Sequence, residues 1–231
     1  MKKLTGIKVI SFDADGTLWD FVKVMRHSLK FVLEAINELD SQAGSKLDID
    51  LMIKIRNKVA NELKGIVTNL EDIRLHAFRE TLKAVKRPNE ELANNLNQIY
   101  LKHRFEDIEL YNDVLPTLRA LKKEYTIGIL SNGNSYPEHC GLEEMFDFVV
   151  FSQDFGIEKP DKEIFNITLE KVKCKKNEIV HIGDSLETDI QGAINAEINY
   201  IWLNRNKIPN PYNFEVEYEI TSLIELIDII L

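Results

Sequence analysis

Two aspartates, Asp13 and Asp15, stand one residue apart in the stretch SFDADGTL, directly after the apolar run IKVI. Carboxylates this close repel each other, so unless one of them is protonated they need a cation nearby. A buried strand that ends in such a pair therefore indicates a site with chemistry rather than a simple turn. The remaining question is which other side chains the fold brings to the same place.

The second half of the chain alternates strand-like and helix-like segments. YTIGIL precedes SNGN, FDFVVFS precedes a loop that ends in EKP, NEIVHIG precedes DSLETD, and INYIWLN precedes a loop rich in Pro and Asn. Between them, LPTLRALKKE, DKEIFNITLEKVK and ETDIQGAINA have helical spacing and composition. Strands that alternate with helices predict an α/β fold, a doubly wound, Rossmann-like parallel sheet with right-handed crossovers.

The stretch from about Trp19 to Glu106 has a helical pattern without a strong strand signal. Apolar residues recur at intervals of three and four, as in Leu29, Val32, Leu33 and Ile36, and again in Leu92, Leu96, Ile99 and Tyr100. SQAGSKLD and KRPNE are candidate breaks between three to five helices. We therefore expect an α/β core of residues 1–18 and 108–231, interrupted by an α-helical insertion of residues 19–107.

In open α/β sheets, ligands bind beyond the carboxyl ends of the strands. Each polar cluster of this chain follows a predicted strand, and together they supply Asp13, Asp15, Ser131, Asn132, Lys159 and Asp184. The crevice would then hold three carboxylates, a lysine, a hydroxyl and an amide. Hard oxygen ligands without His or Cys suit Mg²⁺, which also contacts substrate phosphate.

Composition excludes several other classes. The net charge of −9 over 231 residues argues against a broad nucleic-acid-binding surface, and an anionic substrate must be attracted locally. Cys140 and Cys174 lie far apart without CxxC spacing, so neither a zinc site nor a disulfide framework is indicated. No apolar run approaches the ~18 residues of a membrane span, and the start MKKLTGIKVI is a poor secretory signal. We expect a cytoplasmic protein with no membrane partner.

The ordered set of motifs resembles the haloacid dehalogenase superfamily of phosphohydrolases over nearly the whole chain. DADGTL is similar to the first motif of the family, SNG to the second, EKP to the third and GDSLETD to the fourth. The helical insertion falls where one branch of the family carries an α-helical cap. The resemblance implies a Mg²⁺-dependent phosphatase that hydrolyses a small phosphorylated metabolite.

Residue roles follow from this resemblance. It implies that Asp13 attacks phosphorus to form an aspartyl-phosphate, and that Asp15 protonates the leaving oxygen and later activates water. Lys159 would balance the charge of the transferring group. The ligands of Mg²⁺ would be a carboxylate oxygen of Asp13, the backbone carbonyl of Asp15 and the carboxylate of Asp184.

The resemblance also assigns supporting residues. Ser131 and backbone amides near Asn132 and Gly133 would bind the phosphoryl oxygens. Thr17 is expected to hold Asp13 by a hydrogen bond, and Asp189 is expected to act behind the metal ligands. Two other sets favour plain structural roles: Trp19 is interpreted as a packed aromatic, and a solvated helix face is the expected place of Arg74, His76 and Arg79.

Three rival functions remain open. A phosphate-transferring mutase shares the first step and differs only in the acceptor. A 2-haloacid dehalogenase needs neither Mg²⁺ nor an acid two residues after the nucleophile, so Asp15 and Asp184 argue against it. A catalytically silent ligand-binding domain is disfavoured by the complete carboxylate set. One departure from the family is visible at Glu197, where relatives usually have Gly, and this costs about 1 kcal/mol or requires another helix cap.

Overall fold

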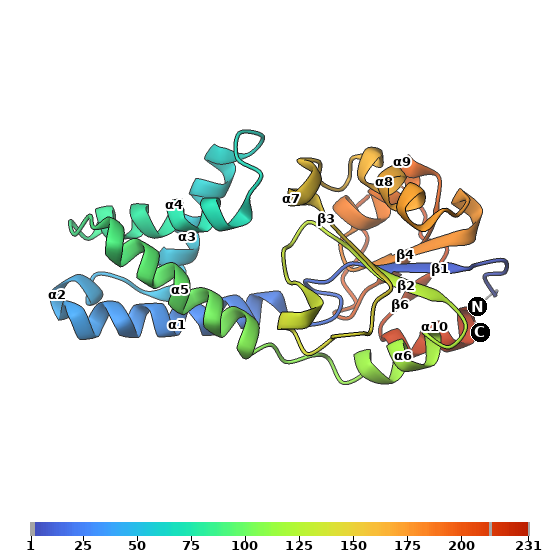
Figure 1. The fold of residues 1–231 in the computed structure, drawn as a ribbon, viewed down its shortest axis with the longest axis horizontal. Helices are drawn as coiled ribbons and strands as arrows, with labels where there is room; N and C mark the ends of the chain where they lie inside the picture. The colour runs from blue at the N-terminus through green and yellow to red at the C-terminus, as the bar shows by residue number, and fades with distance from the viewer. Residues whose placement is uncertain (1–2, 213, 231) are drawn as a thin grey trace. The chain divides into compact units, whose positions relative to one another are not determined.

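The computed structural model describes residues 3–212 and 214–230. The chain divides into two compact units (Figure 1). One comprises Met1–Asp20 and Leu110–Leu231 and contains the sheet; the other, Phe21–Glu109, is helical. In the described part of the chain no helix is both long and apolar enough to span a membrane.

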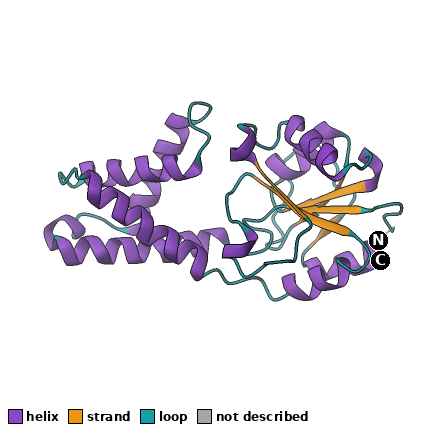
Figure 2. Ribbon diagram, viewed as in Figure 1, coloured by secondary structure: helices purple, strands orange, loops and turns teal. Residues whose placement is uncertain are grey.

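The described residues of the first unit form a six-stranded sheet in the order β3-β2-β1-β4-β5-β6 (Figure 2). Every pair of neighbouring strands is parallel, which confirms the predicted fold class. The strands are β1 (Val9–Phe12), β2 (Thr126–Ser131), β3 (Phe148–Phe151), β4 (Ile179–Gly183), β5 (Asn199–Leu203) and β6 (Glu219–Ile220).

The register of the central strands places their polar ends side by side. Phe12, the last residue of β1, is paired with Ile129 of β2 and with Ile182 of β4. Asp13 therefore leaves β1 level with the ends of both neighbours, and its backbone N–H donates to the carbonyl of Ile182 at 2.8 Å. All four residues of β1 are buried, as expected for a strand covered on both faces.

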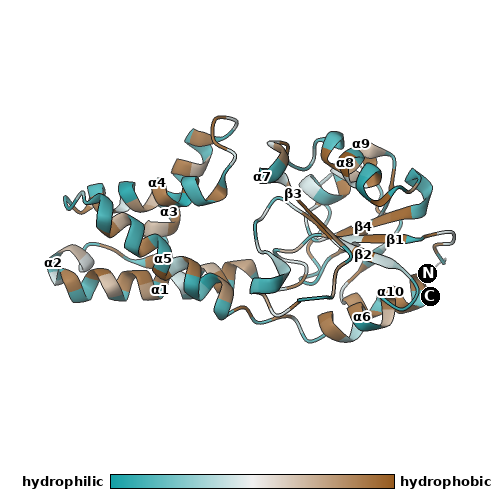
Figure 3. Cartoon of the chain, viewed as in Figure 1, coloured by the Kyte–Doolittle hydropathy of each residue, from teal (hydrophilic) through white to brown (hydrophobic). Residues whose placement is uncertain are grey.

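Helices cover both faces of the sheet (Figure 1). On one face α8 (Lys162–Val172) and α9 (Gln191–Ala196) pack against alternate strand residues such as Val9, Leu130 and Ile179. On the other lie α6 (Val114–Leu121) and α10 (Leu226–Ile230). Figure 3 shows β3 as apolar along its length. The shorter helices and helical turns of this unit are α7 (Ser152–Phe155), η1 (Pro137–His139), η2 (Lys176–Glu178), the π-helical η3 (Leu186–Ile190) and η4 (Leu223–Glu225).

The helical unit consists of α1 (Phe21–Leu39), α2 (Ser41–Gly44), α3 (Ile49–Leu63), α4 (Leu70–Ala84) and α5 (Glu90–Glu106). Its core contains the apolar positions spaced by three and four in α1 and α5, among them Leu29, Val32, Ile36, Leu96 and Tyr100. The side chains of Asp48, Asn69 and Asn89 cap the starts of α3, α4 and α5, because they accept hydrogen bonds from backbone N–H groups of the first turn. The segment read as one break, SQAGSKLD, contains the short helix α2, whose start is capped by Asp40.

Candidate active site

The loop after β1 is held in a tight turn by backbone hydrogen bonds. Leu18 N–H donates to the carbonyl of Ala14 at 2.8 Å, and Gly16 N–H donates to that of Trp19 at 2.8 Å. Gly16 has a φ of +91°, and a Cβ atom there would lie 2.5 Å from Oδ2 of Asp184. Glycine is therefore needed both for the turn and for the close approach of the Asp184 carboxylate.

Lys159 is the centre of a buried ionic cluster. Its Nζ donates to Oδ1 of Asp13 at 2.7 Å, to Oδ1 of Asp189 at 2.5 Å and to the carbonyl of Leu130 at 2.9 Å. The side chains of Lys159 and Asp189 are each 1% exposed, and that of Asp13 is 10% exposed. Two carboxylates therefore share the one positive charge of the lysine where water contributes little, at the end of β1.

Asn132 positions the loop that carries this lysine. Its Oδ1 accepts the backbone N–H of Lys159 at 2.8 Å and the hydroxyl of Ser152 at 2.6 Å, while its Nδ2 donates to the carbonyl of Lys159 at 2.9 Å. The side chain of Asn132, expected near the substrate, thus makes its hydrogen bonds to the protein. Only the backbone of Asn132 therefore remains to contact a ligand.

Asp189 is fixed from three sides. Besides Lys159, its carboxylate accepts the backbone N–H of Ser185 at 3.0 Å and lies 3.2 Å from Nε2 of His181. Nδ1 of His181 lies 2.9 Å from the hydroxyl of Ser11, which comes from the neighbouring strand β1. His181 was not predicted as part of the site. A histidine inside the buried strand NEIVHIG was nevertheless a usable signal, because a buried imidazole needs a polar partner.

The pKa values of the cluster show how its charges are balanced. Burial opposes ionisation of Asp189, but the charge of Lys159 and the hydrogen bond with His181 outweigh it and hold its pKa well below the usual range. Burial raises the pKa of Asp13, and the charge of Lys159 only partly opposes this. Burial, followed by the charge of Asp189, raises the pKa of Asp184 to about 6. One lysine does not balance all three carboxylates.

This imbalance fits a divalent cation. Asp13, Asp184 and Asp189 each offer an oxygen, and these oxygens lie within 4.8 Å of one another. Asp189 is already engaged by Lys159, His181 and Ser185, so Asp13 and Asp184 are the carboxylates that remain suited to a metal. A cation on these two oxygens would offset the cost of keeping both buried groups ionised.

Asp15 lies between the first two loops of the site. Its Oδ1 accepts the indole N–H of Trp19 at 2.8 Å. A Cβ atom on Gly133 would lie 2.8 Å from Oδ2 of Asp15, so this carboxylate rests directly on the loop after β2. Trp19 is fully buried, as its interpretation as a packed aromatic predicts. It also orients Asp15, and this contact was not predicted.

Ser131 and Thr17 complete the set of expected residues. The hydroxyl of Ser131, at the end of β2, accepts the backbone N–H of Gly133 at 3.1 Å. The hydroxyl of Thr17 donates to Oδ1 of Asp184 at 3.4 Å, a different aspartate from the expected Asp13. The physical reason is the turn at Gly16, which carries Thr17 past Asp13 and toward the loop after β4.

Arg205 supports the loop that follows β1. Both terminal nitrogens of Arg205 donate to the carboxylate of Asp113, at 2.8 and 3.0 Å, and Nη2 also donates to the carbonyl of Thr17 at 2.9 Å. The guanidinium stacks on the ring of Tyr111, with its central carbon 4.0 Å from the ring centroid. This bidentate, stacked arginine anchors the end of the loop and was not found from the sequence.

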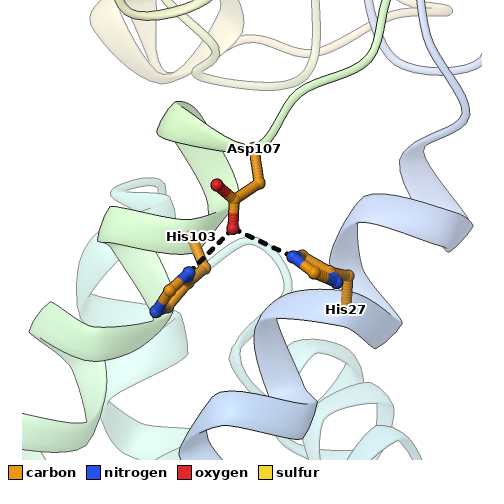
Figure 4. A group of neighbouring side chains, drawn as sticks. All are labelled: His27, His103 and Asp107. Atoms are coloured by element: carbon orange, nitrogen blue, oxygen red, sulfur yellow. Dashed lines mark hydrogen bonds and ion pairs between the residues drawn. The ribbon is translucent and has the colours of Figure 1, made fainter.

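The helical unit contains a separate polar cluster, His27, His103 and Asp107 (Figure 4). Oδ2 of Asp107 lies 2.9 Å from Nε2 of His27 and 2.7 Å from Nδ1 of His103. The ring of Phe31 stacks on that of His103, with 3.6 Å between the centroids. Such a donor set could bind a divalent transition metal, but here Asp107 serves as the common acceptor that links α1 to the end of α5.

Comparison with known proteins identifies the family of this chain. Residues 7–197 match the family model described as haloacid dehalogenase-like hydrolase. Human N-acylneuraminate-9-phosphatase is 29% identical over 96% of this chain and 93% of its own length. Pyrimidine 5'-nucleotidase YjjG of Escherichia coli is 28% identical over 94% of this chain and 95% of its own length.

Solved structures show the same architecture. A 2-haloacid dehalogenase from Pseudomonas syringae is 26% identical, with a TM-score of 0.83 over 96% of this chain and 97% of its own. The putative hydrolase YfnB from Bacillus subtilis, solved with bound magnesium, is 25% identical, with a TM-score of 0.73 over 96% and 98% of the two chains. The segment that matches the family model, residues 7–197, runs from just before β1 to the end of α9. It therefore includes the loops that carry Asp13, Ser131, Lys159 and Asp184. The chain belongs to the haloacid dehalogenase-like hydrolases.

Proposed function

We propose that the protein is a Mg²⁺-dependent phosphatase that hydrolyses a small phosphomonoester through a phosphorylated Asp13. The observation that carries this proposal is the second acid, Asp15, which Trp19 holds against the loop after β2. Loss of a halide needs no proton donor, whereas cleavage of a phosphate ester releases an alkoxide that does. The phosphatase and nucleotidase names of the relatives support the same reaction class.

In the first step, a carboxylate oxygen of Asp13 forms a bond to phosphorus while the bond from phosphorus to the ester oxygen breaks. Asp15 in its acid form gives its proton to the departing oxygen, and the alcohol leaves. Lys159 keeps Asp13 in place and contributes positive charge beside the phosphoryl group. Hydrogen-bond donors for the phosphoryl oxygens come from Ser131 and the backbone around Gly133.

In the second step, water attacks the phosphorus of the aspartyl-phosphate. Asp15, now a carboxylate, takes a proton from this water, and the bond between phosphorus and Asp13 breaks to release phosphate. Asp13 returns to its ionised form and Asp15 to its acid form, so protons and charges balance over the cycle. The same geometry therefore serves Asp15 twice, as acid and then as base.

Asp13 and Asp184 would hold the Mg²⁺, with the backbone carbonyl of Asp15 as the third protein ligand. The ion supplies positive charge that stabilises the negative phosphoryl group. Thr17 donates to Asp184, and His181 and Lys159 hold Asp189 beside it. These contacts keep the ligand carboxylates in place before a metal or a substrate binds.

In this proposal the helical unit is a cap that governs substrate choice and access. A closing cap excludes water and completes the site, whereas each residue assigned to the chemistry belongs to the unit that contains the sheet. Substitutions of polar residues in the helical unit should then alter preference among natural phosphates more than activity on a small activated ester.

A second candidate is 2-haloacid dehalogenase activity, which the similarity to the Pseudomonas syringae enzyme favours. The two reactions separate in one experiment. The purified protein is incubated with a panel of phosphorylated metabolites, with p-nitrophenyl phosphate and with 2-chloropropionate, each with Mg²⁺ or with excess chelator. Phosphate release that depends on Mg²⁺, without chloride release, supports the proposal. Chloride release that persists in chelator, or full phosphatase activity after rigorous metal removal, would contradict it.

Transfer to an acceptor other than water, as in a mutase, is resolved by the same panel. A hydrolase releases inorganic phosphate in proportion to the alcohol formed. A mutase returns the phosphate to a second position of the substrate and releases little. A complete absence of turnover across the panel would favour a silent ligand-binding domain.

A further inference from the structure

The helical unit brings three arginines together from three different helices. Arg56 comes from α3, Arg74 from α4 and Arg104 from α5. Arg56 and Arg104 both lie over the ring of Phe21, with their guanidinium carbons 5.7 and 4.9 Å from its centroid. The guanidinium carbon of Arg74 lies 5.2 Å from the centroid of Tyr100. Two aromatic rings therefore hold three like charges in one region of the unit.

Arg74 has a donor that the described part of the structure leaves unused. Its Nη1 is buried and, among the residues that the structure describes, has no hydrogen-bond partner. Burial lowers the pKa of Arg74 to about 10, and the charges of Arg104 and Arg56 act in the same direction, while Tyr100 and Glu71 oppose them. A guanidinium whose buried terminal nitrogen has no acceptor carries a cost that an anion would remove.

Other arginines of the same unit behave differently. Arg79 makes a bidentate contact with Glu90, Arg87 donates to Asp40 at 2.7 Å, and Arg26 donates to Asp50 at 2.6 Å. These are the solvated pairs that a charged helix face predicts, so that interpretation fits Arg79 and fails for Arg74. The helical spacing of the sequence did not distinguish Arg74 from Arg79, which lie five positions apart on α4.

We propose that Arg74, with Arg56 and Arg104 beside it, forms an anion-binding site in the helical unit that receives a carboxylate or a phosphate group of a small molecule. A planar guanidinium held against an aromatic ring presents its remaining N–H donors in a fixed direction and loses little freedom when an oxyanion binds. Two sources share this chemistry: an acidic group of the substrate remote from the reacting phosphate, or a separate anionic effector.

Binding is tested directly, without turnover, so the result does not depend on the proposed function. Malonate, which carries two carboxylates and no phosphorus, is titrated into the full-length protein by calorimetry with Mg²⁺ held constant. Arg74→Gln should weaken malonate binding by about 10- to 100-fold, the worth of hydrogen bonds to a charged group. The matched control, Arg79→Gln on the same helix, should bind as the wild type does.

A change in folding is kept apart from a change in binding. If Arg74→Gln lowers the thermal midpoint, Arg74→Lys serves instead, because it keeps the charge and the aliphatic stem but loses the bidentate fork. A folded Arg74 variant that binds malonate like the wild type, an equal loss in Arg79→Gln, or no binding by the wild type would each overturn the proposal.

The two sources separate in kinetics. If the anion belongs to the substrate, Arg74→Gln should raise KM for 3-phosphoglycerate, which carries a carboxylate, and leave KM for glycerol 3-phosphate unchanged. Such a result rests on the proposed phosphatase activity. If the anion is an effector, malonate should alter turnover of glycerol 3-phosphate in the wild type but not in Arg74→Gln. If Arg74→Gln weakens malonate binding but neither kinetic effect is seen, the anion site is confirmed. Its connection with the proposed phosphatase activity is then refuted.

Discussion

Replacement of Lys159 by Met removes the cation that two buried carboxylates share. Nζ lies 2.7 Å from Asp13 and 2.5 Å from Asp189, and the lysine side chain is 1% exposed. Breaking a buried pair by removing one partner typically costs about 3–5 kcal/mol, because the other charge stays buried without compensation. We expect a loss of this size in the free energy of unfolding near pH ~7 without Mg²⁺.

The loss should depend on pH in a definite direction. In the wild type the charge of Lys159 holds the pKa of Asp189 low, whereas that of Asp13 is already raised. Without Lys159, burial raises the folded pKa of Asp189 above the unfolded value, so folding becomes less favourable as pH rises through that interval. The penalty grows by about 1.4 kcal/mol per pH unit for each carboxylate that stays protonated in the folded state but ionises in the unfolded state. For one carboxylate this amounts to about 3.5 kcal/mol between about pH 7 and about pH 4.5, so at about pH 4.5 the loss should shrink to less than about 2 kcal/mol.

Urea unfolding of wild type and variant at both pH values measures these losses. The matched control is Lys162→Met, an exposed lysine three positions along, which should change the free energy of unfolding by no more than about 0.5 kcal/mol at either pH. An equal loss for Lys159→Met at both pH values would refute the reasoning, because the cost would then not be electrostatic. A loss no larger than that of the control would show that the ionic cluster contributes nothing to stability.

Three further predictions concern other parts of the molecule. Burial raises the pKa of Asp184 to about 6, and a metal binds the ionised form of the carboxylate. The affinity for Mg²⁺, measured by calorimetry, should therefore rise as pH increases through this value, and a constant affinity would contradict Asp184 as a ligand. Glu197 follows the last residue of α9 and has a φ of 60°, so Glu197→Gly should raise the free energy of unfolding in urea by about 1 kcal/mol. A lower free energy of unfolding would show that the Glu197 side chain contributes more than the backbone strain costs. Asp107→Asn should weaken the contact between α1 and α5 by less than about 1 kcal/mol because the cluster is partly exposed, and a larger loss in thermal or urea unfolding would assign it a greater role.

The sequence predicted the sheet and its polar edge for identifiable reasons. The five predicted strands, β1 to β5, are mainly apolar runs that end in short polar motifs, whereas the two-residue β6 was not predicted. The parallel topology alone brings Asp13, Ser131 and Asp184 to one edge. These predictions depend on local pattern and on one general rule of α/β sheets. The ionic contact between Lys159 and Asp13 joins residues far apart in the chain, and it was not predicted, because Lys159 was assigned to the transferring phosphoryl group.

What the sequence could not predict are the partners of individual side chains. Thr17 was assigned to Asp13 but donates to Asp184, because the direction of a turn at glycine is not encoded in the motif letters. His181 and Arg205 were missed since their partners, Asp189 and Asp113, lie on other segments. Arg74 and Arg79 look alike in the sequence, but Arg79 pairs with Glu90 from another helix, whereas the guanidinium of Arg74 lies by the ring of Tyr100.

The central claim, that Asp13 carries the phosphoryl group while Asp15 moves the protons, is tested by rapid mixing of Asp15→Asn with p-nitrophenyl phosphate and Mg²⁺. The nitrophenolate leaves without much help, so the first step should survive, whereas hydrolysis of the intermediate lacks its base. We predict a burst of nitrophenolate close to one equivalent per active site, a slow phase afterwards, and phosphate found on Asp13 by mass spectrometry. With an alkyl phosphate, which needs a proton donor, the first step should slow by about 10²–10⁴-fold. A folded, Mg²⁺-binding variant that shows no burst and no phosphate on Asp13 would contradict the account.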